Sequence, residues 1–189
     1  MLGTWNESRQ SRTEMGARHI LVVTGASGAG KTSAVRALEA RGLDGVRCFY
    51  FDSVGVPSAE IMQRDFGGGE KWQAHATARW LAQLDALSRD VRVAVLDGQT
   101  RPSFVFDAAD RAPTSDLHVA LLDCSPEARG ERLRGPRGQP ELASDRMTSW
   151  ASYLRDQADA RGLPIIDTTS LTVDEVADEL EALLRGLGA

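Results

Sequence analysis

The sequence predicts an α/β fold in which a parallel β-sheet is covered by helices on both faces. Three observations support this prediction. Strand-like apolar runs alternate with helix-like segments along the chain. A glycine-rich phosphate-binding pattern lies between the first such strand and the first helix. The length of 189 residues and the hydrophobic fraction of 42% suit one compact domain with an ordinary core.

The predicted strands are apolar runs bounded by turn-forming segments. They cover residues 19–24, 46–52, 91–97, 117–123 and 163–167. Several of these runs end in an aspartate, and in an open α/β sheet the carboxyl ends of the strands form the edge at which ligands bind. We therefore expect the functional residues at that edge.

The predicted helices are recognised by periodic apolar residues and by their end signals. They cover residues 31–41, about 70–89, 126–134 with 144–161, and 173–186. Ser125 and Pro126 form an N-cap followed by proline at the first helical position. Thr172 and Glu175 form a capping box at the start of the last helix.

We expect residues 1–18 to be a flexible leader and residues 19–189 to be a single domain. The leader is polar and lacks the apolar segment of a secretory signal, and no apolar run is long enough to cross a bilayer. The net charge of −5 disfavours long nucleic acids as partners. These properties favour a cytoplasmic protein that acts on a small molecule; they leave its oligomeric state open.

The segment 25–32 matches the pattern G-x-x-x-x-G-K-[ST] between a strand and a helix. Its backbone N–H groups and the positive end of the helix dipole would face one anionic group. Lys31 would reach the outer phosphates of ATP, and Thr32 would help to hold Mg²⁺. The expected nucleotide-binding residues are Gly25, Ala26, Ser27, Gly28, Ala29, Gly30, Lys31, Thr32 and Ser33.

Asp97 is the candidate for a second Mg²⁺ ligand. It ends the apolar run 91–97 as the aspartate of a Walker B strand does, and it would orient the metal near Thr32. The alternative is a turn residue, because Asp-Gly pairs are common in turns and Gly98 follows.

Two glycine-bearing segments outside the alternating core are candidates for an acceptor-binding insert and a lid. The insert covers about residues 53–89 and offers Arg64 and Arg79 to a ligand. The lid covers about residues 132–142, where Arg132 and Arg137 would stabilise a transferring phosphoryl group. A solvated, charged helix is the alternative for the lid arginines, and it fits Arg129 best.

The segment Leu96-Asp97-Gly98-Gln99-Thr100-Arg101 resembles the L-D-G-x-x-R element of nucleoside monophosphate kinases of the adenylate kinase type. The order of parts over residues 19–186 is similar to that of the wider group of small P-loop kinases, which act on nucleotides, shikimate, gluconate and related metabolites. The resemblance implies a three-layer P-loop fold with strand order 2-3-1-4-5 and ATP with Mg²⁺ as donor. It places Gln99 and Arg101 at the acceptor. Gln99 and Thr100 replace the F-P of adenylate kinases, which argues against AMP as the acceptor.

The same resemblance implies roles for residues at two other strand ends. An acid at the position of Asp52 contacts the acceptor hydroxyl in small metabolite and polynucleotide kinases and can act as the general base. The alternative is an aspartate that caps the next turn together with Ser53. Thr168 and Thr169 would lie beside the adenine.

The expected function is phosphoryl transfer from ATP to a small acceptor, either a hydroxyl compound or a nucleoside monophosphate. Two alternatives remain: a P-loop protein that binds ATP for regulation, and a polynucleotide 5′-hydroxyl kinase. A guanine-nucleotide switch is disfavoured because no N-K-x-D motif follows any predicted strand.

Overall fold

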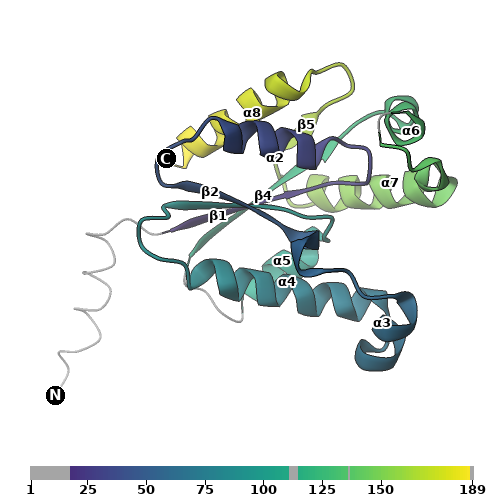
Figure 1. Ribbon diagram of the computed structural model, residues 1–189, viewed down its shortest axis with the longest axis horizontal. Helices are drawn as coiled ribbons and strands as arrows, with labels where there is room; N and C mark the ends of the chain where they lie inside the picture. The colour runs from purple at the N-terminus through teal and green to yellow at the C-terminus, as the bar shows by residue number, and fades with distance from the viewer. Residues whose placement is uncertain (1–17, 111–114, 136, 188–189) are drawn as a thin grey trace.

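The computed structural model describes residues 18–110, 115–135 and 137–187. The expected leader lies outside this part of the chain except for Arg18, and so does residue 136 of the expected lid. Figure 1 shows three layers, with a central sheet between two sets of helices. None of the described helices is long and apolar enough to span a bilayer.

The sheet has five parallel strands in the order β2-β3-β1-β4-β5, which confirms the implied order 2-3-1-4-5. The strands are β1 (His19–Thr24), β2 (Val46–Tyr50), β3 (Val93–Asp97), β4 (Asp116–Asp123) and β5 (Ile165–Asp167). β2 is shorter than predicted because its one neighbour, β3, ends at Asp97 opposite Tyr50. The next residue, Phe51, instead starts the short 3₁₀ helix η1 (Phe51–Val54), and its ring is buried.

Five helices agree with the prediction to within a few residues: α2 (Lys31–Ala40), α4 (Gly69–Asp85), α6 (Pro126–Arg134), α7 (Asp145–Asp159) and α8 (Val173–Gly186). Two further helices, α3 (Ala59–Phe66) and α5 (Pro102–Ala109), and the 3₁₀ turn η2 (Pro140–Leu142) lie in segments that the sequence analysis assigned to no regular element. The expected N-cap of α6 at Ser125 and the capping box of α8 are both present.

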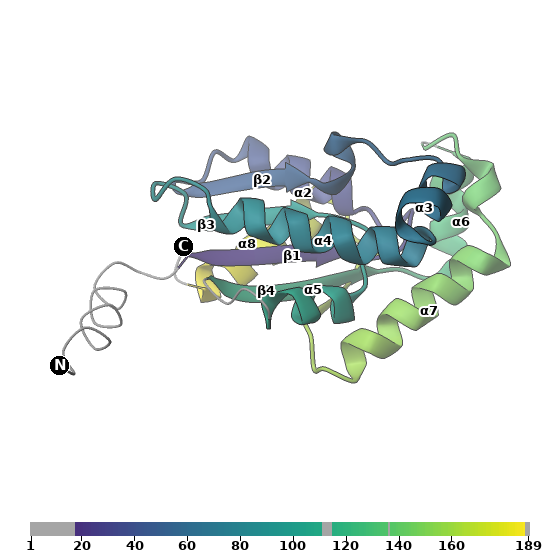
Figure 2. The same cartoon turned by 90° about the horizontal axis from the view of Figure 1, so that it is seen from below.

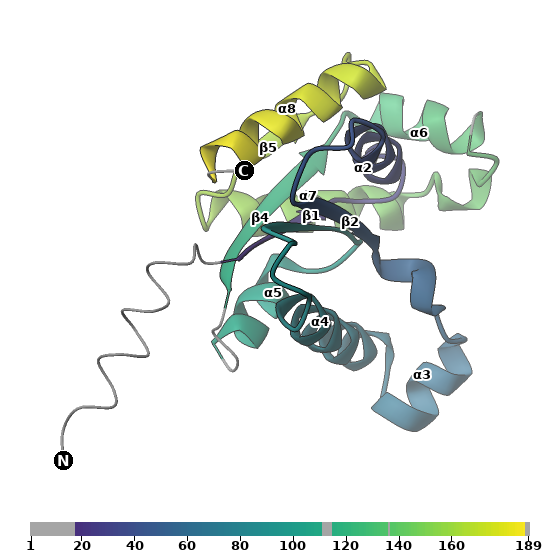
Figure 3. The ribbon, with the colours of Figure 1, turned by 60° about the vertical axis from the view of Figure 1, so that its left-hand side comes forward.

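Each face of the sheet has its own core, because alternate residues of a strand point to opposite faces. On one face, Leu21 and Val23 of β1 pack with residues of α2 and α8. On the other, Ile20 and Val22 pack with residues of α4 and α5. Figures 2 and 3 show these two pairs of helices on opposite sides of the sheet. A smaller cluster joins α7 to β4. The sheet is therefore packed on both faces, and its carboxyl edge can position side chains for chemistry.

Candidate active site

The phosphate-binding loop is tightly fitted against β4 and α6. A Cβ atom at Gly25 would lie 2.2 Å from the carbonyl oxygen of Leu122, so only glycine allows this approach. Gly28 has φ +84°, and a Cβ atom there would lie 2.9 Å from Cγ of Arg129. The loop conformation that the sequence pattern predicts is therefore reinforced by neighbouring elements.

Lys31 begins α2 and is buried, with its ammonium donating a 3.1 Å hydrogen bond to the carbonyl oxygen of Ala26. Burial lowers the pKa of Lys31 to about 8; the Asp97 and Asp52 carboxylates oppose that shift, whereas the Arg137 guanidinium adds to it. Four charged groups, predicted separately from the sequence, thus lie within electrostatic range of one another at the P-loop.

The Thr32 hydroxyl donates a 2.6 Å hydrogen bond to the Asp97 carboxylate. Burial raises the pKa of Asp97, and the Lys31 charge and the Thr32 hydrogen bond counteract this effect. Among the described residues, no cluster of three or more His, Cys, Asp or Glu side chains could hold a metal ion. A nucleotide-bound Mg²⁺ needs no such cluster, because water and phosphate oxygens supply most of its ligands. The two adjacent oxygens of Thr32 and Asp97 therefore fit Mg²⁺.

Asp52 lies in η1, directly after β2, and its side chain is exposed. In the described part of the chain, no hydrogen bond to its carboxylate is found, and none to Ser53. Its charge nevertheless acts on the pKa of both Lys31 and Asp97. The carboxylate thus has no hydrogen-bond partner among the described residues and lies within electrostatic range of Lys31.

The two expected lid arginines lie in different surroundings. Arg132 donates hydrogen bonds to the Thr168 hydroxyl at 2.9 Å and to the Thr168 carbonyl oxygen at 2.5 Å. Arg137 is exposed, donates to Gln139, and acts on the pKa of Lys31. Arg132 therefore joins α6 to the loop after β5, whereas Arg137 is the arginine close to the phosphate-binding lysine.

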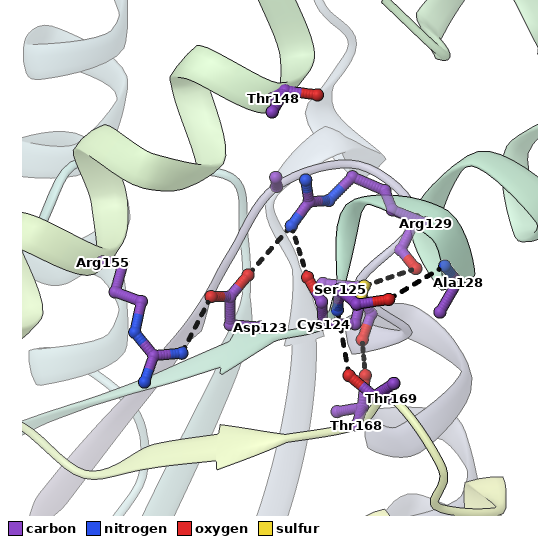
Figure 4. A network of polar contacts seen from close by, with 12 residues as sticks. Asp123, Cys124, Ser125, Ala128, Arg129, Thr148, Arg155, Thr168 and Thr169 are labelled. Carbon is purple, nitrogen blue, oxygen red and sulfur yellow. Dashed lines mark hydrogen bonds and ion pairs between the residues drawn. The ribbon is translucent and has the colours of Figure 1, made fainter.

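The interpretation of Arg129 as part of a solvated, charged helix is wrong. Its side chain is buried, and it donates hydrogen bonds to the Asp123 carboxylate at 3.0 Å and to the Cys124 carbonyl oxygen at 2.8 Å. Figure 4 shows Asp123 between the guanidinium groups of Arg129 and Arg155. α6 packs on the P-loop at Gly28, and this packing turns Arg129 inward.

A cavity of about 440 Å³ extends from the P-loop toward α8. Gly28, Arg132 and Arg137 line its polar end. Its other end is lined by the segment 171–176, which includes Leu171 and Val173. A polar end beside a P-loop and an apolar end suit the phosphates and the base of a nucleotide, respectively. Thr168 also lines this cavity.

Gln99 connects the phosphate-binding loop to the insert. Its side-chain oxygen accepts a 2.9 Å hydrogen bond from the Ser27 hydroxyl, and its backbone oxygen accepts a 2.8 Å hydrogen bond from the Gln73 amide. Ser27 belongs to the P-loop and Gln73 to α4. Gln99 therefore lies between the two halves of the expected site.

Arg101 precedes α5, and its side chain contacts three helices. Its guanidinium donates hydrogen bonds to Gln73 and, at 3.2 Å, to Glu70, both on α4. Three aromatic rings surround it, with centroids at 5.0 Å for Phe104, 4.8 Å for Trp150 and 5.8 Å for Tyr153. The side chain of Arg101 is only 17% exposed, so most of it is already enclosed.

Comparison with solved structures gives many matches over nearly the whole chain. A shikimate kinase from Acinetobacter baumannii in complex with shikimate has 18% identity and a TM-score of 0.59, covering 93% of this chain and 97% of the other. A gluconokinase from Sinorhizobium meliloti has 23% identity and a TM-score of 0.58, with 90% and 91% covered. The tunicamycin resistance protein of Deinococcus radiodurans has 20% identity and a TM-score of 0.63, with 88% and 95% covered. The fold is that of the small P-loop kinases. No protein-family model matches the chain, and no curated protein matches it in sequence.

In this small P-loop kinase fold, the other two arginines expected at the acceptor lie apart from Arg101. Arg64 is exposed on α3 and pairs with the adjacent Asp65 at 2.6 Å. Arg79 is exposed and lines a cavity with Trp72 and Trp80. Arg79 follows Gln73 by about 240° around α4, which places it on a different face from the Arg101 contacts.

The sequence analysis missed Gln73, Trp150 and Tyr153, which contact Arg101. Trp150 and Tyr153 stack with ring centroids 5.4 Å apart, and the Trp150 indole nitrogen is buried without a hydrogen-bond partner. The spacing of three residues on one helix indicates a shared face, but only the tertiary structure places that face against Arg101.

Proposed function

We propose that this chain is an ATP-dependent phosphotransferase that moves the γ-phosphate of ATP to a hydroxyl group of a small molecule. The observation that carries this proposal is the convergence of Asp97, Asp52 and Arg137 on Lys31. These residues supply the charges that phosphoryl transfer needs: cations for the transferring group, a metal ligand and a base. The fold shared with a shikimate kinase and a gluconokinase supports the same class of reaction.

A hydroxyl acceptor is favoured by the free carboxylate of Asp52. A nucleoside monophosphate offers a phosphate oxygen that is already ionised, so its phosphorylation needs no base. A hydroxyl group must lose a proton as its oxygen attacks phosphorus, and an unpaired carboxylate close to the phosphate site can accept that proton.

The proposed reaction assigns one step to each residue. The acceptor oxygen attacks the γ-phosphorus, its proton passes to the Asp52 carboxylate, and the bond to the leaving oxygen of ADP breaks. Lys31 and Arg137 stabilise the negative charge on the transferring oxygens. Mg²⁺ bound at Thr32 and Asp97 would neutralise charge on the outer phosphates. Arg132 and Thr168 hold the nucleotide side of the site together.

An acceptor panel tests the class of reaction. ATP with Mg²⁺ is mixed with nucleosides, nucleoside monophosphates, sugars, hydroxyacids and a 5′-hydroxyl oligonucleotide, and ADP release is followed. We expect a small hydroxyl compound to raise ADP release well above the background hydrolysis. If no acceptor does so, the regulatory alternative replaces the phosphotransferase; if only the oligonucleotide does so, the polynucleotide kinase alternative replaces it.

Asp52→Asn tests the base. We expect kcat to fall about 10²-fold or more with little change in the KM of ATP, because the variant keeps the shape of the side chain but accepts no proton. Asp97→Asn is the comparison, since it should raise the Mg²⁺ concentration needed for half-maximal rate. Asp110→Asn, at an exposed position after α5, controls for loss of surface charge. A near-normal kcat for Asp52→Asn would exclude the base role.

A further inference from the structure

We infer that the acceptor is an uncharged hydroxyl compound with an aromatic or aliphatic body, rather than a carboxylate- or phosphate-bearing metabolite. This inference rests on the proposed phosphotransfer and concerns its acceptor. It depends on two features of the described residues: the charges of the arginines on the acceptor side are already balanced or solvated, and the surface that follows Asp52 is apolar.

Arg101 has little capacity left for an anionic acceptor. Glu70 balances its charge at 3.2 Å, and Gln73 accepts a second hydrogen bond. Phe104 and Trp150 cover its guanidinium with their rings. A carboxylate or phosphate would have to displace Glu70 and enter between the rings, whereas an uncharged acceptor leaves the ion pair intact.

The other two arginines near the insert offer no enclosed positive site. Arg64 is exposed and is paired with Asp65. Arg79 is exposed, so water solvates its charge. An anionic small molecule is normally held by charge-assisted hydrogen bonds from enclosed cations, and such bonds are weak where water competes.

Apolar side chains gather directly after Asp52. Val54, Val56 and Ile61 are 64%, 52% and 38% exposed. Single exposed apolar residues are common, but three within eight positions form a patch that suits a ligand or partner. Val54 belongs to the same short helix as Asp52, so the patch begins where the proposed base is held.

Val54 of this patch also lines a cavity of about 220 Å³, together with Gly55 and Pro57. Its walls are mostly aromatic or aliphatic, with Val54, Phe66, Trp72 and Trp80 among them. The exposed Arg79, with His75 and Gln83, supplies its polar wall. An apolar cavity of about 150 Å³ is enough to hold benzene. The cavity can therefore hold a ring or a short alkyl group of the acceptor, and Val54 joins it to the short helix that carries Asp52.

The test compares acceptors in matched pairs, each with one uncharged, apolar member. The pairs are 1-phenyl-1,2-ethanediol with glycerate, and 4-nitrophenyl β-glucoside with gluconate. We expect the uncharged member to have a kcat/KM at least about tenfold higher in every pair that reacts, because burial of a ring favours binding by that order. A higher kcat/KM for the charged members overturns the inference while the phosphotransferase stands. If no member raises ADP release, the proposed function itself fails, and the inference with it.

Two exposed valines provide matched variants. Val54→Ser should raise the KM of the preferred acceptor several-fold and leave the KM of ATP unchanged. Val173→Ser, at a 48% exposed valine of the nucleotide cavity, should do the reverse. Glu70→Gln adds a third readout: if the acceptor is anionic, the freed Arg101 lowers its KM, which overturns the inference. A change of oligomeric state on Val54→Ser, with the acceptor KM unaltered, would also overturn it, since the patch would then bind a second copy of the chain.

Discussion

Lys31 carries a charge that the fold makes costly to keep. The side chain is buried, and burial lowers its pKa to about 8 despite the two nearby carboxylates. The unfolded chain holds the same proton more tightly, up to its ordinary pKa of 10.5. Below pH 8 the buried charge of Lys31 therefore lowers the free energy of unfolding by its full amount. The free energy of unfolding increases as pH rises from about 8 toward 10.5. A bound phosphate chain would compensate for that cost directly.

This behaviour predicts proton uptake when a nucleotide binds. Phosphates next to Lys31 should raise its pKa, so binding of ADP with Mg²⁺ at pH 8 should take up about half a proton, and affinity should fall as pH rises above 8. Calorimetric titration in buffers of different ionisation enthalpy measures the uptake. Binding without proton uptake at pH 8, and with a pH-independent Kd from 7 to 9, would contradict the prediction.

The different surroundings of Arg132 and Arg137 predict different kinetic effects. Arg137→Ala should lower kcat by about 10²-fold, because this arginine is close to Lys31. Arg132→Ala should mainly raise the KM of ATP, by roughly tenfold, because it loosens the loop at Thr168. Each variant is the control for the other in steady-state kinetics. Equal losses of kcat would show that the two side chains act together.

For individual residues, roles set by local sequence patterns could be predicted from the sequence, and roles set by tertiary contacts could not. The P-loop and Asp97 are defined by neighbouring residues, and the structure brings Thr32 and Asp97 together as expected. The partners of Arg101 come from α4 and α7, which lie far from it in sequence. No short-range signal connects such residues.

Among the elements, the strongly periodic ones were predictable and the short ones were not. α8 was predicted to its last residue because a capping box and a regular apolar face define it. α3 is only eight residues long and has no buried residue, so its short apolar pattern did not stand out from the surrounding loop. α5 begins at Pro102, directly after the segment that the resemblance to L-D-G-x-x-R marked for its chemistry and not for its structure.

The contact between the P-loop and α6 can be tested at Gly28. Gly28→Ala should destabilise the protein by about 1–3 kcal/mol more than Gly42→Ala, and should weaken nucleotide binding. Both glycines have positive φ, +84° and +61°, but only a Cβ atom at Gly28 would meet Arg129 and Leu133. Urea unfolding and ADP titration of the two variants give the comparison. Equal destabilisation would mean that backbone strain alone matters and that the contact with α6 does not.

For the whole molecule, the alternation of strands and helices was enough to predict the layers, and the resemblance supplied the strand order. The alternation cannot specify how α7 packs, because that helix contacts both β4 and α5 through Leu154 and its neighbours. The position of α7 in turn decides which rings reach Arg101. The acceptor side is therefore the part of the site that required the structure.

Arg18 links distant parts of the molecule, since its guanidinium donates to carbonyl oxygens at the end of α4 and in the segment that leads to β3. These oxygens belong to Leu84, Asp85, Leu87, Ser88 and Val91, at 2.6 to 3.0 Å. Arg18→Met should lower the free energy of unfolding by about 1–3 kcal/mol, because the helix end loses its donors. Arg47→Met, at a 63% exposed arginine with one ion pair at 4.0 Å, should cost far less in the same urea titration. Similar losses for the two variants would argue against a role of Arg18 in holding the helix end.

Gln99 should couple the binding affinities of the two substrates. One amide residue holds Ser27 on the nucleotide side and Gln73 on the acceptor side, so ordering either partner also restricts the other. The binding free energy of the first substrate therefore includes part of the conformational entropy lost in ordering both half-sites. Binding should therefore be synergistic and reciprocal: ATP should lower the Kd of the acceptor by the same factor by which the acceptor lowers that of ATP.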